Sequence, residues 1–313
     1  KLKINLLYIC FIAGLFVSGQ VGAQVPYDRI VNATEEPENW LTYNGDYMSQ
    51  RYSRLDQITP DNVTNLELKW ILQNQVFGAW QSNPIIVDGV MYVTERPNSV
   101  MAVDASTGRV FWKFRHTPSE NARVCCGANN RGVAVLDDRV FMGTLDARLI
   151  ALDRINGQPL WNTEVADVNL AYSVTMAPLV VKDKIIVGVG GGEYGIRGYV
   201  AAFDAETGEQ AWKTYTIPGP GELGHDSWEG DDWEHGGASV WITGSFDPEL
   251  NLTYWGVGNP GPDWNAGQRP GDNLFSDSVI ALDADTGELE WYFQFTPNDG
   301  YDYDAVQVPV LAD

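Results

Sequence analysis

The residues best suited to chemistry in this sequence are three carboxylates and one amide. Glu193, Asp302 and Asp304 supply the carboxylates, and Asn259 supplies the amide oxygen. An all-oxygen set of this kind suits a hard cation and suits zinc or copper poorly. Each residue alone reads more simply as a surface acid or a turn residue. Gly190–Gly192 precede Glu193 and would let the backbone approach a ligand closely.

Two adjacent cysteines, Cys125 and Cys126, are a second unusual feature. Neighbouring thiols either close a strained eight-membered disulfide ring or stay free. As two small buried hydrophobes they would need no further role. Arg131 and Trp241 add a planar guanidinium that can grip a carboxylate and a flat aromatic face. The cysteines alone leave both of their states open.

The first 23 residues have the form of a secretory signal peptide. A basic start, an apolar stretch over residues 6–17 and small residues before Gln24 predict cleavage after Ala23. An uncleaved anchor is the alternative, although the apolar run is short for a spanning helix. We therefore expect residues 24–313 to form one exported domain without stable membrane insertion, in a compartment that permits disulfides.

The chain is strongly acidic, with 42 Asp and Glu against 20 Lys and Arg and a net charge of −22. This charge argues against nucleic acid as a partner. It fits a soluble exported protein, or one that meets a basic partner through electrostatic steering. The 32 Gly and 12 Trp argue against a helical bundle.

One sequence motif recurs four times and predicts the fold class. Each copy is an apolar strand, an Asp-x-x-x-Gly turn and a strand that carries Trp. The Asp starts the turn by hydrogen bonding to its own backbone, and the Gly supplies positive φ. A hairpin precedes each copy, so each unit has four short strands. The pattern predicts an all-β propeller whose blades are docked by the repeated Trp. The four turns begin at Asp104, Asp153, Asp204 and Asp283.

The unusual residues fall at equivalent positions of this repeat, just before a first strand or just after a second strand. Antiparallel pairing brings the start of the first strand and the end of the second to one end of a blade, so these residues should converge on one mouth of the central channel. They are Gln81, Arg131, Thr175, Ser239, Asp302 and Asp304 before first strands, and Gly190–Glu193 and Asn259 after second strands. An insertion over residues 218–237 would be a surface excursion or a cover over the site.

Residues 306–313 look like the first strand of a further blade. About four blades plus pieces cannot close a ring, and an open propeller leaves strand edges unpaired. We therefore expect the native chain to be longer.

With these residues in view, the chain closely resembles the pyrroloquinoline quinone (PQQ)-dependent alcohol dehydrogenases, a family of periplasmic quinoproteins. The resemblance runs from Trp40 to the end of the chain. It implies an eight-bladed propeller, of which this chain would be the N-terminal half or slightly more. The motifs that carry it are Cys-Cys-Gly-Ala-Asn-Asn-Arg-Gly, Gly-Gly-Gly-Glu-Tyr-Gly-Ile-Arg-Gly, Gly-Asn-Pro-Gly-Pro, Arg-Pro-Gly-Asp-Asn and Thr-Pro-Asn-Asp-Gly-Tyr-Asp-Tyr-Asp.

The resemblance implies a role for each unusual residue. Cys125 and Cys126 would form a vicinal disulfide on one face of the quinone, with Trp241 on the other. Asp302 would be the catalytic base that takes the alcohol's proton. A primary alcohol would be oxidised to an aldehyde by hydride transfer to PQQ, with electrons passed to a c-type cytochrome in the periplasm. Cofactor contacts would come from Arg131, Thr175, Ser239, Gly191 and Gly192, and metal ligands from Glu193, Asn259 and Asp302.

Two positions depart from the commonest family pattern. Gln81 stands where members often carry Glu, and its amide can still hydrogen-bond the cofactor without a charge. Asp304 lies two residues after the expected base, and in an extended strand both would face the same ion. Calcium-dependent members of the family commonly have a small or neutral residue at this position. The lanthanide-dependent members, which this chain resembles here, have Asp. We therefore expect a lanthanide(III), with calcium and an averted Asp304 as the alternative.

Two other functions fit parts of the sequence. A non-catalytic propeller, such as an outer-membrane assembly scaffold, needs the docking Trp residues but has no use for the cysteine pair or the acids in register. A quinoprotein acting on polyols or aldehydes differs only in a substrate pocket that would extend beyond Asp313. For the same reason, we do not expect this piece alone to turn over. A homodimer is a possible assembly.

Overall fold

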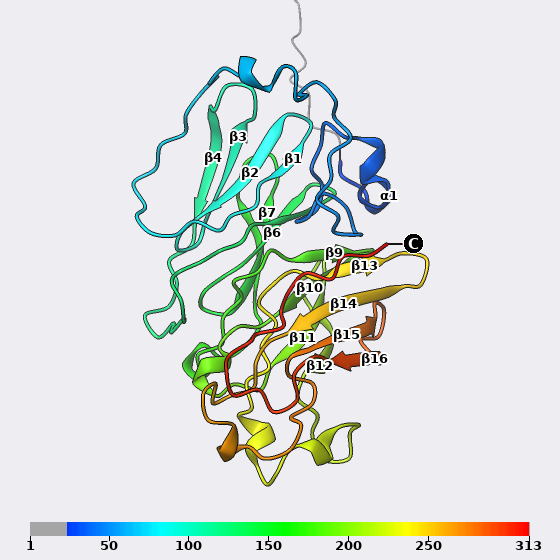
Figure 1. Cartoon of the computed structure of the whole chain (residues 1–313). Helices are drawn as coiled ribbons and strands as arrows, with labels where there is room; N and C mark the ends of the chain where they lie inside the picture. The colour runs from blue at the N-terminus through cyan, green and yellow to red at the C-terminus, as the bar shows by residue number, and fades with distance from the viewer. Residues whose placement is uncertain (1–23, 313) are drawn as a thin grey trace, which may run out of the picture.

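The computed structural model describes residues 24–312, so the predicted signal peptide lies outside the described residues. Four antiparallel sheets of four strands follow one another in chain order (Figure 1), which confirms the predicted propeller blades. The first two contain β1 (Ile85–Val87), β2 (Val90–Glu95), β3 (Ser99–Asp104), β4 (Val110–Arg115), and β5 (Ala134–Leu136), β6 (Arg139–Gly143), β7 (Arg148–Asp153), β8 (Pro159–Glu164). The others contain β9 (Leu179–Val181), β10 (Lys184–Gly188), β11 (Tyr199–Asp204), β12 (Gln210–Tyr215), and β13 (Ser245–Asp247), β14 (Leu252–Val257), β15 (Ser278–Asp283), β16 (Leu289–Gln294).

The repeated Asp-x-x-x-Gly turn joins the third and fourth strands of every sheet. In the third sheet, Asp204 Oδ1 accepts the backbone N–H groups of Glu206 and Thr207 at 3.0 and 2.7 Å. Gly208 closes this turn at φ +75°, a region that side chains with a Cβ rarely adopt. The two strands shift register after the same alanine in each sheet, at Ala102, Ala151, Ala202 and Ala281.

The repeated Trp docks each sheet onto the next, as predicted. Its indole N–H donates to a backbone carbonyl of the following sheet, and its ring covers the glycine of that sheet's turn. A Cβ on the glycine would lie only 2.5–2.8 Å from the ring. The donor–acceptor pairs are Trp112 with Arg154, Trp161 with Ala205 and Trp212 with Ala284, at 3.0–3.2 Å. Trp70, which the repeat pattern did not include, docks in the same way on Ala105 at 3.0 Å.

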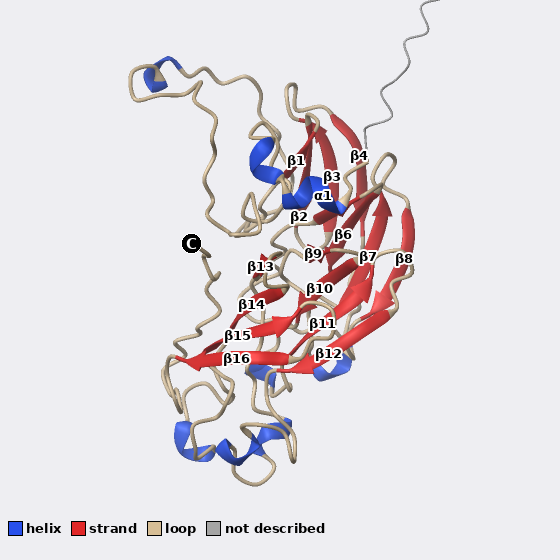
Figure 2. Cartoon of the chain, turned by 90° about the vertical axis from the view of Figure 1, so that its right-hand side faces the viewer, coloured by secondary structure: helices blue, strands red, loops and turns tan. Residues whose placement is uncertain are grey.

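Short helices connect and flank the sheets (Figure 2). They are α1 (Tyr27–Val31) and the 3-10 helices η1 (Ala33–Glu35), η2 (Val63–Asn65), η3 (Val168–Leu170), η4 (Gly192–Tyr194), η5 (His225–Ser227), η6 (Asp232–Glu234) and η7 (Ala266–Gln268). The insertion over residues 218–237 holds η5 and η6 at the lower end of Figure 1. Over residues 24–312, none of these helices has the length and apolar character needed to cross a membrane.

The expected strand at the C-terminal end is absent from residues 301–312, which run as irregular chain. This segment nevertheless packs beside the fourth sheet, as Figure 2 shows. Val306 is 1% exposed, and a Cβ on Gly256 of β14 would meet its backbone at 2.5 Å. The backbone N–H of Leu311 donates to Met48 at 2.9 Å. The predicted strand is not formed over the described residues, because none of them forms a strand pair with this segment, although Val306 packs on Gly256 as Val240, before β13, packs on Gly188.

Candidate functional site

A cavity of about 620 Å³ lies where the sheets present the starts of their first strands. It collects eleven of the thirteen residues that were given a role in the sequence analysis; their binding roles remain predictions. None of its lining residues belongs to the insertion over residues 218–237, which is a surface excursion and not a cover. The predicted residues on its wall are Gln81, Cys125, Cys126, Arg131, Thr175, Gly191, Glu193, Ser239, Trp241, Asp302 and Asp304.

Backbone hydrogen bonds between neighbouring sheets explain this convergence. The backbone N–H of Asn83 donates to Arg131 at 2.9 Å, and that of Arg131 donates to Thr175 at 3.0 Å. Further along, the backbone N–H of Val240, before the fourth sheet, donates to Val189, after β10 of the third sheet, at 2.9 Å. Successive first strands are thus joined just before they begin. Side chains at this phase of the repeat therefore face a common space.

Arg131 forms one wall of the cavity and is almost wholly buried, at 9% exposure. Its Nη1 donates to Thr175 Oγ1 at 2.9 Å, and its Cζ lies 4.6 Å from the ring centroid of Trp241. Burial lowers the pKa of Arg131, but guanidinium remains charged in proteins. The wall therefore carries a fixed positive charge against an aromatic ring.

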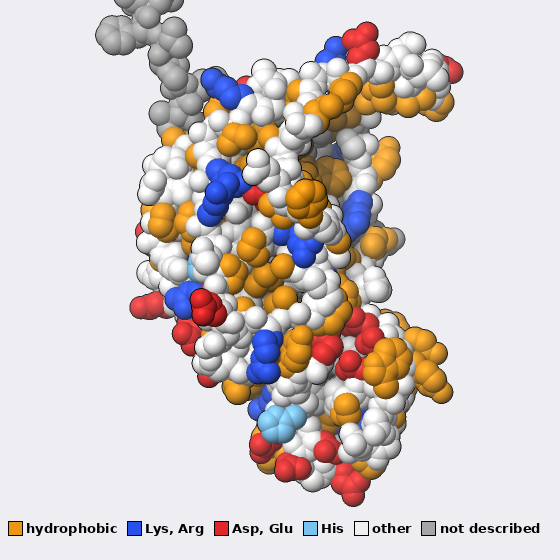
Figure 3. All heavy atoms as spheres, turned by 90° about the vertical axis from the view of Figure 1, so that its left-hand side faces the viewer, with side chains coloured by type: hydrophobic (Ala, Val, Ile, Leu, Met, Phe, Trp, Pro, Cys, Tyr) orange, Lys and Arg blue, Asp and Glu red, His pale blue; other side chains and the backbone are white. Residues whose placement is uncertain are grey.

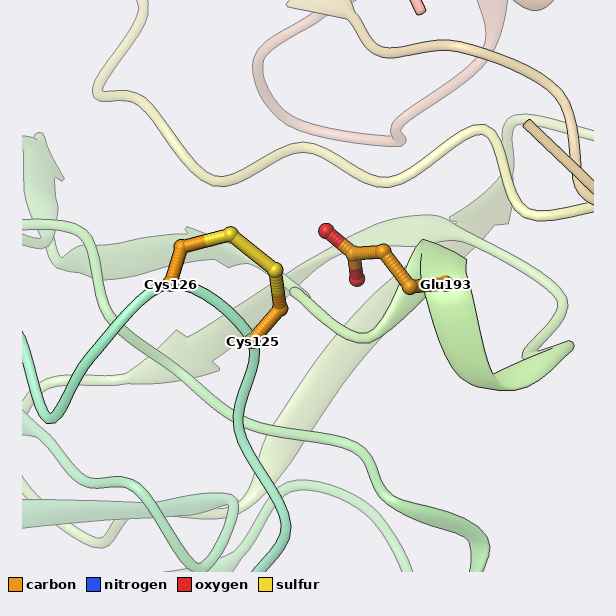
Figure 4. A group of neighbouring side chains, drawn as sticks. All are labelled: Cys125, Cys126 and Glu193. Atoms are coloured by element: carbon orange, nitrogen blue, oxygen red, sulfur yellow. A yellow bond between two sulfur atoms is a disulfide. The ribbon is translucent and has the colours of Figure 1, made fainter. Parts of the chain in front are cut away.

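Cys125 and Cys126 form the vicinal disulfide that the family resemblance implied. The bridge faces Glu193 from the opposite loop, as Figure 4 shows. The two sulfur atoms and a Glu193 carboxylate oxygen lie within 4.8 Å of one another. Sulfur held in a disulfide is not the thiolate that binds soft metals. This trio is therefore a wall of the cavity and not a metal centre.

Glu193 reaches the cavity from η4, whose geometry depends on the preceding glycines. Gly191 has φ +120°, and a Cβ there would lie 2.4 Å from the carbonyl oxygen of Ala171. Burial, together with the charges of Asp263 and Asp302, raises the pKa of Glu193. The carboxylate thus lies on the open cavity wall, close to the negative charges of Asp263 and Asp302.

Asp302 and Asp304 line the same cavity, but not by the geometry expected from the sequence. Both have positive φ, at +61° and +58°, so the chain between them is not an extended strand. Burial raises the pKa of Asp304 to about 6, against a bond from Trp241 that lowers it. That bond runs from Trp241 Nε1 to Asp304 Oδ1 at 3.3 Å. The pKa of Asp302 is also raised, by burial and by Asp263 and Asp299.

Two buried carboxylates that sequence reasoning missed hold the 301–305 loop in this shape. Asp299 accepts the backbone N–H groups of Tyr301 and Tyr303, both at 2.9 Å. Asp277 Oδ1 accepts that of Ala305 at 3.1 Å. The positive φ values of Asp302 and Asp304 are thereby stabilised from both sides.

Arg269 ties this loop to the one that carries Asn259. It is 1% exposed and donates to the backbone carbonyls of Pro262 and Asp299. Its motif, Arg-Pro-Gly-Asp-Asn, was noted in the sequence without a role. Long-range bonds to backbone carbonyls leave no local pattern from which that role could be read.

Asn259 and Gly192 are the two predicted residues that do not line the cavity. Both are buried just behind its wall. A Cβ on Gly192 would lie 3.2 Å from Ser239 Oγ, so the glycine allows this close approach. Asn259 Nδ2 donates to Asp263 Oδ1 at 2.9 Å. Asp263 does line the cavity, and sequence reasoning missed it although it follows the Gly-Asn-Pro-Gly-Pro motif directly.

Three of the four predicted metal ligands, Glu193, Asp302 and Asp304, line the cavity without closing to coordination distance. Among residues 24–312, the trio of Cys125, Cys126 and Glu193 is the one group of three His, Cys, Asp or Glu ligand atoms within 4.8 Å. Glu193, Asp302 and Asp304 therefore stand further apart than that limit. Their raised pKa values reflect burial and shared negative charge.

Comparison with known proteins gives consistent matches. The sequence profile of the glucose/ethanol/alcohol dehydrogenase β-propeller domain, a PQQ profile, matches residues 40–313. A quinohemoprotein alcohol dehydrogenase of Pseudomonas putida is 43% identical over 95% of this chain and 44% of its own length. A lanthanide-dependent methanol dehydrogenase of Methylacidiphilum fumariolicum is 38% identical over 96% of this chain and 53% of its own.

Solved structures give the same picture. A europium-containing methanol dehydrogenase superposes with a TM-score of 0.84 and 38% identity, over 89% of this chain and 52% of that one. The chain spans about half the length of the curated relatives it matches.

Proposed function

Because the chain belongs to the glucose/ethanol/alcohol dehydrogenase β-propeller family, we propose that its protein oxidises a primary alcohol to an aldehyde with PQQ and a bound cation. The observation that supports this most is the composition of the cavity. One space of about 620 Å³ holds a buried guanidinium, an aromatic ring, a disulfide and three carboxylates. A propeller that served only as a scaffold would have no need to bring these groups into one cavity.

The cavity fits a planar quinone that carries carboxylates. Arg131 offers a guanidinium fork, and Thr175 and Ser239 offer hydroxyl groups on the same wall. Trp241 and the disulfide offer an aromatic ring and a rigid bridge as further surfaces. Gly191 adds backbone atoms to the same cavity wall. Gln81 adds a neutral amide at the rim of this space.

The donor set also fits a hard cation. Glu193, Asp302 and Asp304 are carboxylates whose pKa values are raised by burial and by the charges of neighbouring carboxylates. A cation among them would offset that repulsion, and oxygen ligands are those that calcium and similar ions prefer. Asn259, buried just behind these acids, would add a neutral oxygen.

The chain's own residues would then divide the work. When bound, PQQ supplies the two-electron acceptor and the metal supplies a Lewis acid. Asp302 is exposed to the cavity and is the residue that would take the hydroxyl proton of the alcohol. Asp299 holds the loop that aims it. Arg131 and Trp241 would orient the cofactor.

For the metal, we favour a lanthanide(III) over calcium. Asp304 adds a third carboxylate to the cavity, and a third negative charge better balances a trivalent ion than a divalent one. Trp241 Nε1 donates to Asp304 Oδ1, which keeps this carboxylate on the cavity wall. Two relatives named above are a lanthanide-dependent and a europium-containing methanol dehydrogenase.

Reconstitution of apoprotein at full family length tests this function. With PQQ and La³⁺ we expect oxidation of primary alcohols, followed with an artificial electron acceptor, and loss of that activity in Asp302→Asn. Activity with Ca²⁺ alone, unaffected by Asp304→Ala, would contradict the lanthanide assignment. Absence of PQQ binding with either metal, measured by equilibrium dialysis, would contradict the function itself.

The disulfide has its own test. Cys126→Ala leaves the blades intact, because neither cysteine belongs to a strand or to the buried core. We expect this variant to retain PQQ poorly on dialysis while its circular dichroism stays unchanged. Wild-type retention and turnover would show that the bridge is no wall for the quinone.

A c-type cytochrome as electron acceptor and a periplasmic location complete the proposal. Acidic side chains gather at the lower end of the face in Figure 3, and the insertion at that end contains six Asp and Glu residues. Such a surface favours encounter with a basic partner, at a rate that falls as salt is added. A disulfide is stable in an oxidising compartment.

A further inference from the structure

Asp263 lies in the same cavity as the predicted cation ligands, and none of the roles described so far has been assigned to it. It lines the cavity together with Glu193, Asp302 and Asp304. Its carboxylate is close enough to Glu193 and Asp302 for its charge to raise the pKa of both. It therefore belongs to the same electrostatic cluster as the predicted cation ligands.

The carboxylate of Asp263 fixes which way the Asn259 amide points. Asn259 Nδ2 donates to Asp263 Oδ1 at 2.9 Å and to the carbonyl of Pro260 at 3.3 Å. An ionised carboxylate only accepts hydrogen bonds, so the amide must offer its NH₂ group on that side. Asn259 Oδ1 then points the other way, and no hydrogen bond within residues 24–312 is donated to it.

The bond is not needed to shape the loop that carries both residues. The Asn259 carbonyl accepts the N–H of Ala238 at 2.9 Å, and the N–H of Gly261 donates to Gly236 at 2.8 Å. Arg269 holds the carbonyl of Pro262 at 3.3 Å. The backbone on both sides of the turn is thus anchored by other groups. The remaining effect of the Asp263 bond is on the Asn259 side chain.

We propose that Asp263 is a positioning residue for the cation site, acting through Asn259: it holds the amide so that Oδ1 is free to bind the ion. This inference rests on the function proposed above. Residues that orient metal ligands typically contribute about 10- to 100-fold to metal affinity. Asp263→Asn removes the orientation, because a second amide can accept or donate and lets the Asn259 amide rotate by half a turn.

Terbium luminescence provides a readout that does not depend on turnover. Tb³⁺ alone is titrated into the chain and excited through nearby Trp, and decay lifetimes in H₂O and D₂O report the number of water molecules on the ion. We expect Asp263→Asn to weaken Tb³⁺ binding roughly tenfold or more and to add a bound water where Asn259 Oδ1 is lost. Asp61→Asn is the matched control, because Asp61 is exposed and forms no hydrogen bond through its side chain.

A double-mutant cycle with Asn259→Ala separates positioning from other roles. If Asp263 acts through Asn259, Asp263→Asn adds no further water in the Asn259→Ala background. An added water in that background would make Asp263 a direct ligand and overturn the inference. Unchanged affinity and lifetime in the single variant, with far-UV circular dichroism confirming the fold, would also overturn it.

The failure of the proposed function would look different. Glu193→Gln and Asp304→Asn should both weaken Tb³⁺ binding if the cavity holds the cation. If the wild-type chain binds no Tb³⁺ that these variants affect, the cation site and the role of Asp263 both fail. If they weaken binding and Asp263→Asn does not, only the role of Asp263 fails.

Discussion

The blades carry acidic side chains at both of their ends, and the two groups differ in what their oxygens meet. At the turns far from the cavity, Asp204 Oδ1 accepts two backbone N–H groups and the hydroxyl of Thr207. Burial would raise the pKa of Asp204, but the bonds from Thr207 and Glu206 lower it overall. Asp283 behaves in the same way with Thr286 and Asp285.

At the cavity end, the carboxylates meet fewer donors and more negative charge. The pKa values of Glu193, Asp302 and Asp304 are all raised, with burial as the largest cause in each case. The same chemical group thus stabilises the fold where backbone donors meet its charge, and carries poorly compensated negative charge where they do not. The comparison predicts that mutations of the cavity acids will weaken cation binding, whereas mutations of the turn acids will lower stability.

The largest difference should be in cation binding. Glu193→Gln keeps the shape of the side chain but removes a charge from the cavity, so we expect Tb³⁺ affinity to fall roughly 100-fold or more, beyond the loss typical of an orienting residue. Asp204→Asn removes a charge of the same sign at the far end and should leave affinity unchanged. Calorimetric titration measures both. Equal losses in the two variants would mean that net charge alone controls binding.

The next effect is on stability at the docking turns. Gly208→Ala would place a Cβ 2.6 Å from Thr163 Oγ1 and 2.8 Å from the ring of Trp161, at a position with φ +75°. We expect it to lower the free energy of unfolding by about 2–4 kcal/mol, from backbone strain and overpacking together. Gly89→Ala is the control, because Gly89 has φ +78° but nothing within 4 Å of the added Cβ. It should lose only the strain contribution in urea denaturation.

If Gly89→Ala and Gly208→Ala lose the same stability, the close contacts of Gly208 with Thr163 and Trp161 add nothing, and the docking interpretation is wrong. If Gly208→Ala also weakens Tb³⁺ binding with the protein fully folded, the two ends of the blade are not independent.

The pH dependence of stability should have opposite signs for two buried acids. Burial raises the pKa of Asp277 to about 7, against 3.8 in an unfolded chain. The unfolded state therefore loses this proton first, and stability falls as pH rises from about 4 to 7. Burial would also raise the pKa of Asp146, but bonds from His116, Thr144 and Ser119 lower it to about 2. Its contribution is present above pH 3.8 and is lost as pH falls toward 2.

Urea denaturation in a chelator at a series of pH values tests both signs. Asp277→Asn should flatten the slope between pH 4 and 7, which one group limits to about 1.4 kcal/mol per pH unit. Asp146→Asn should change only the region below pH 4. An Asp277→Asn profile parallel to wild type would show that its carboxyl is ionised in the folded protein.

The same contrast explains how much could be predicted from sequence. The turns and docking Trp residues are local patterns repeated four times, and from them the sheets and three of the docking contacts follow. Convergence of Arg131, Thr175 and Ser239 follows from strand phase. Asp302 and Asp304 were predicted to lie at this cavity, which is correct, and in an extended strand, which is wrong. Their positive φ values depend on hydrogen bonds to Asp299 and Asp277. Of these, Asp277 is distant in sequence and has no local signature.

The smallest effect should come from the turn acids themselves. Asp204→Ala removes the acceptor of two backbone N–H groups at a partly exposed turn, so we expect a loss of about 1 kcal/mol in the free energy of unfolding. Asp204→Asn should recover most of it, because the amide oxygen can accept the same bonds. Urea denaturation at pH 7 measures both variants. Failure of Asn to restore stability would mean that the turn needs the charge of Asp204. The carboxylates at both ends of the blade would then act through their charge, although their hydrogen bonds differ.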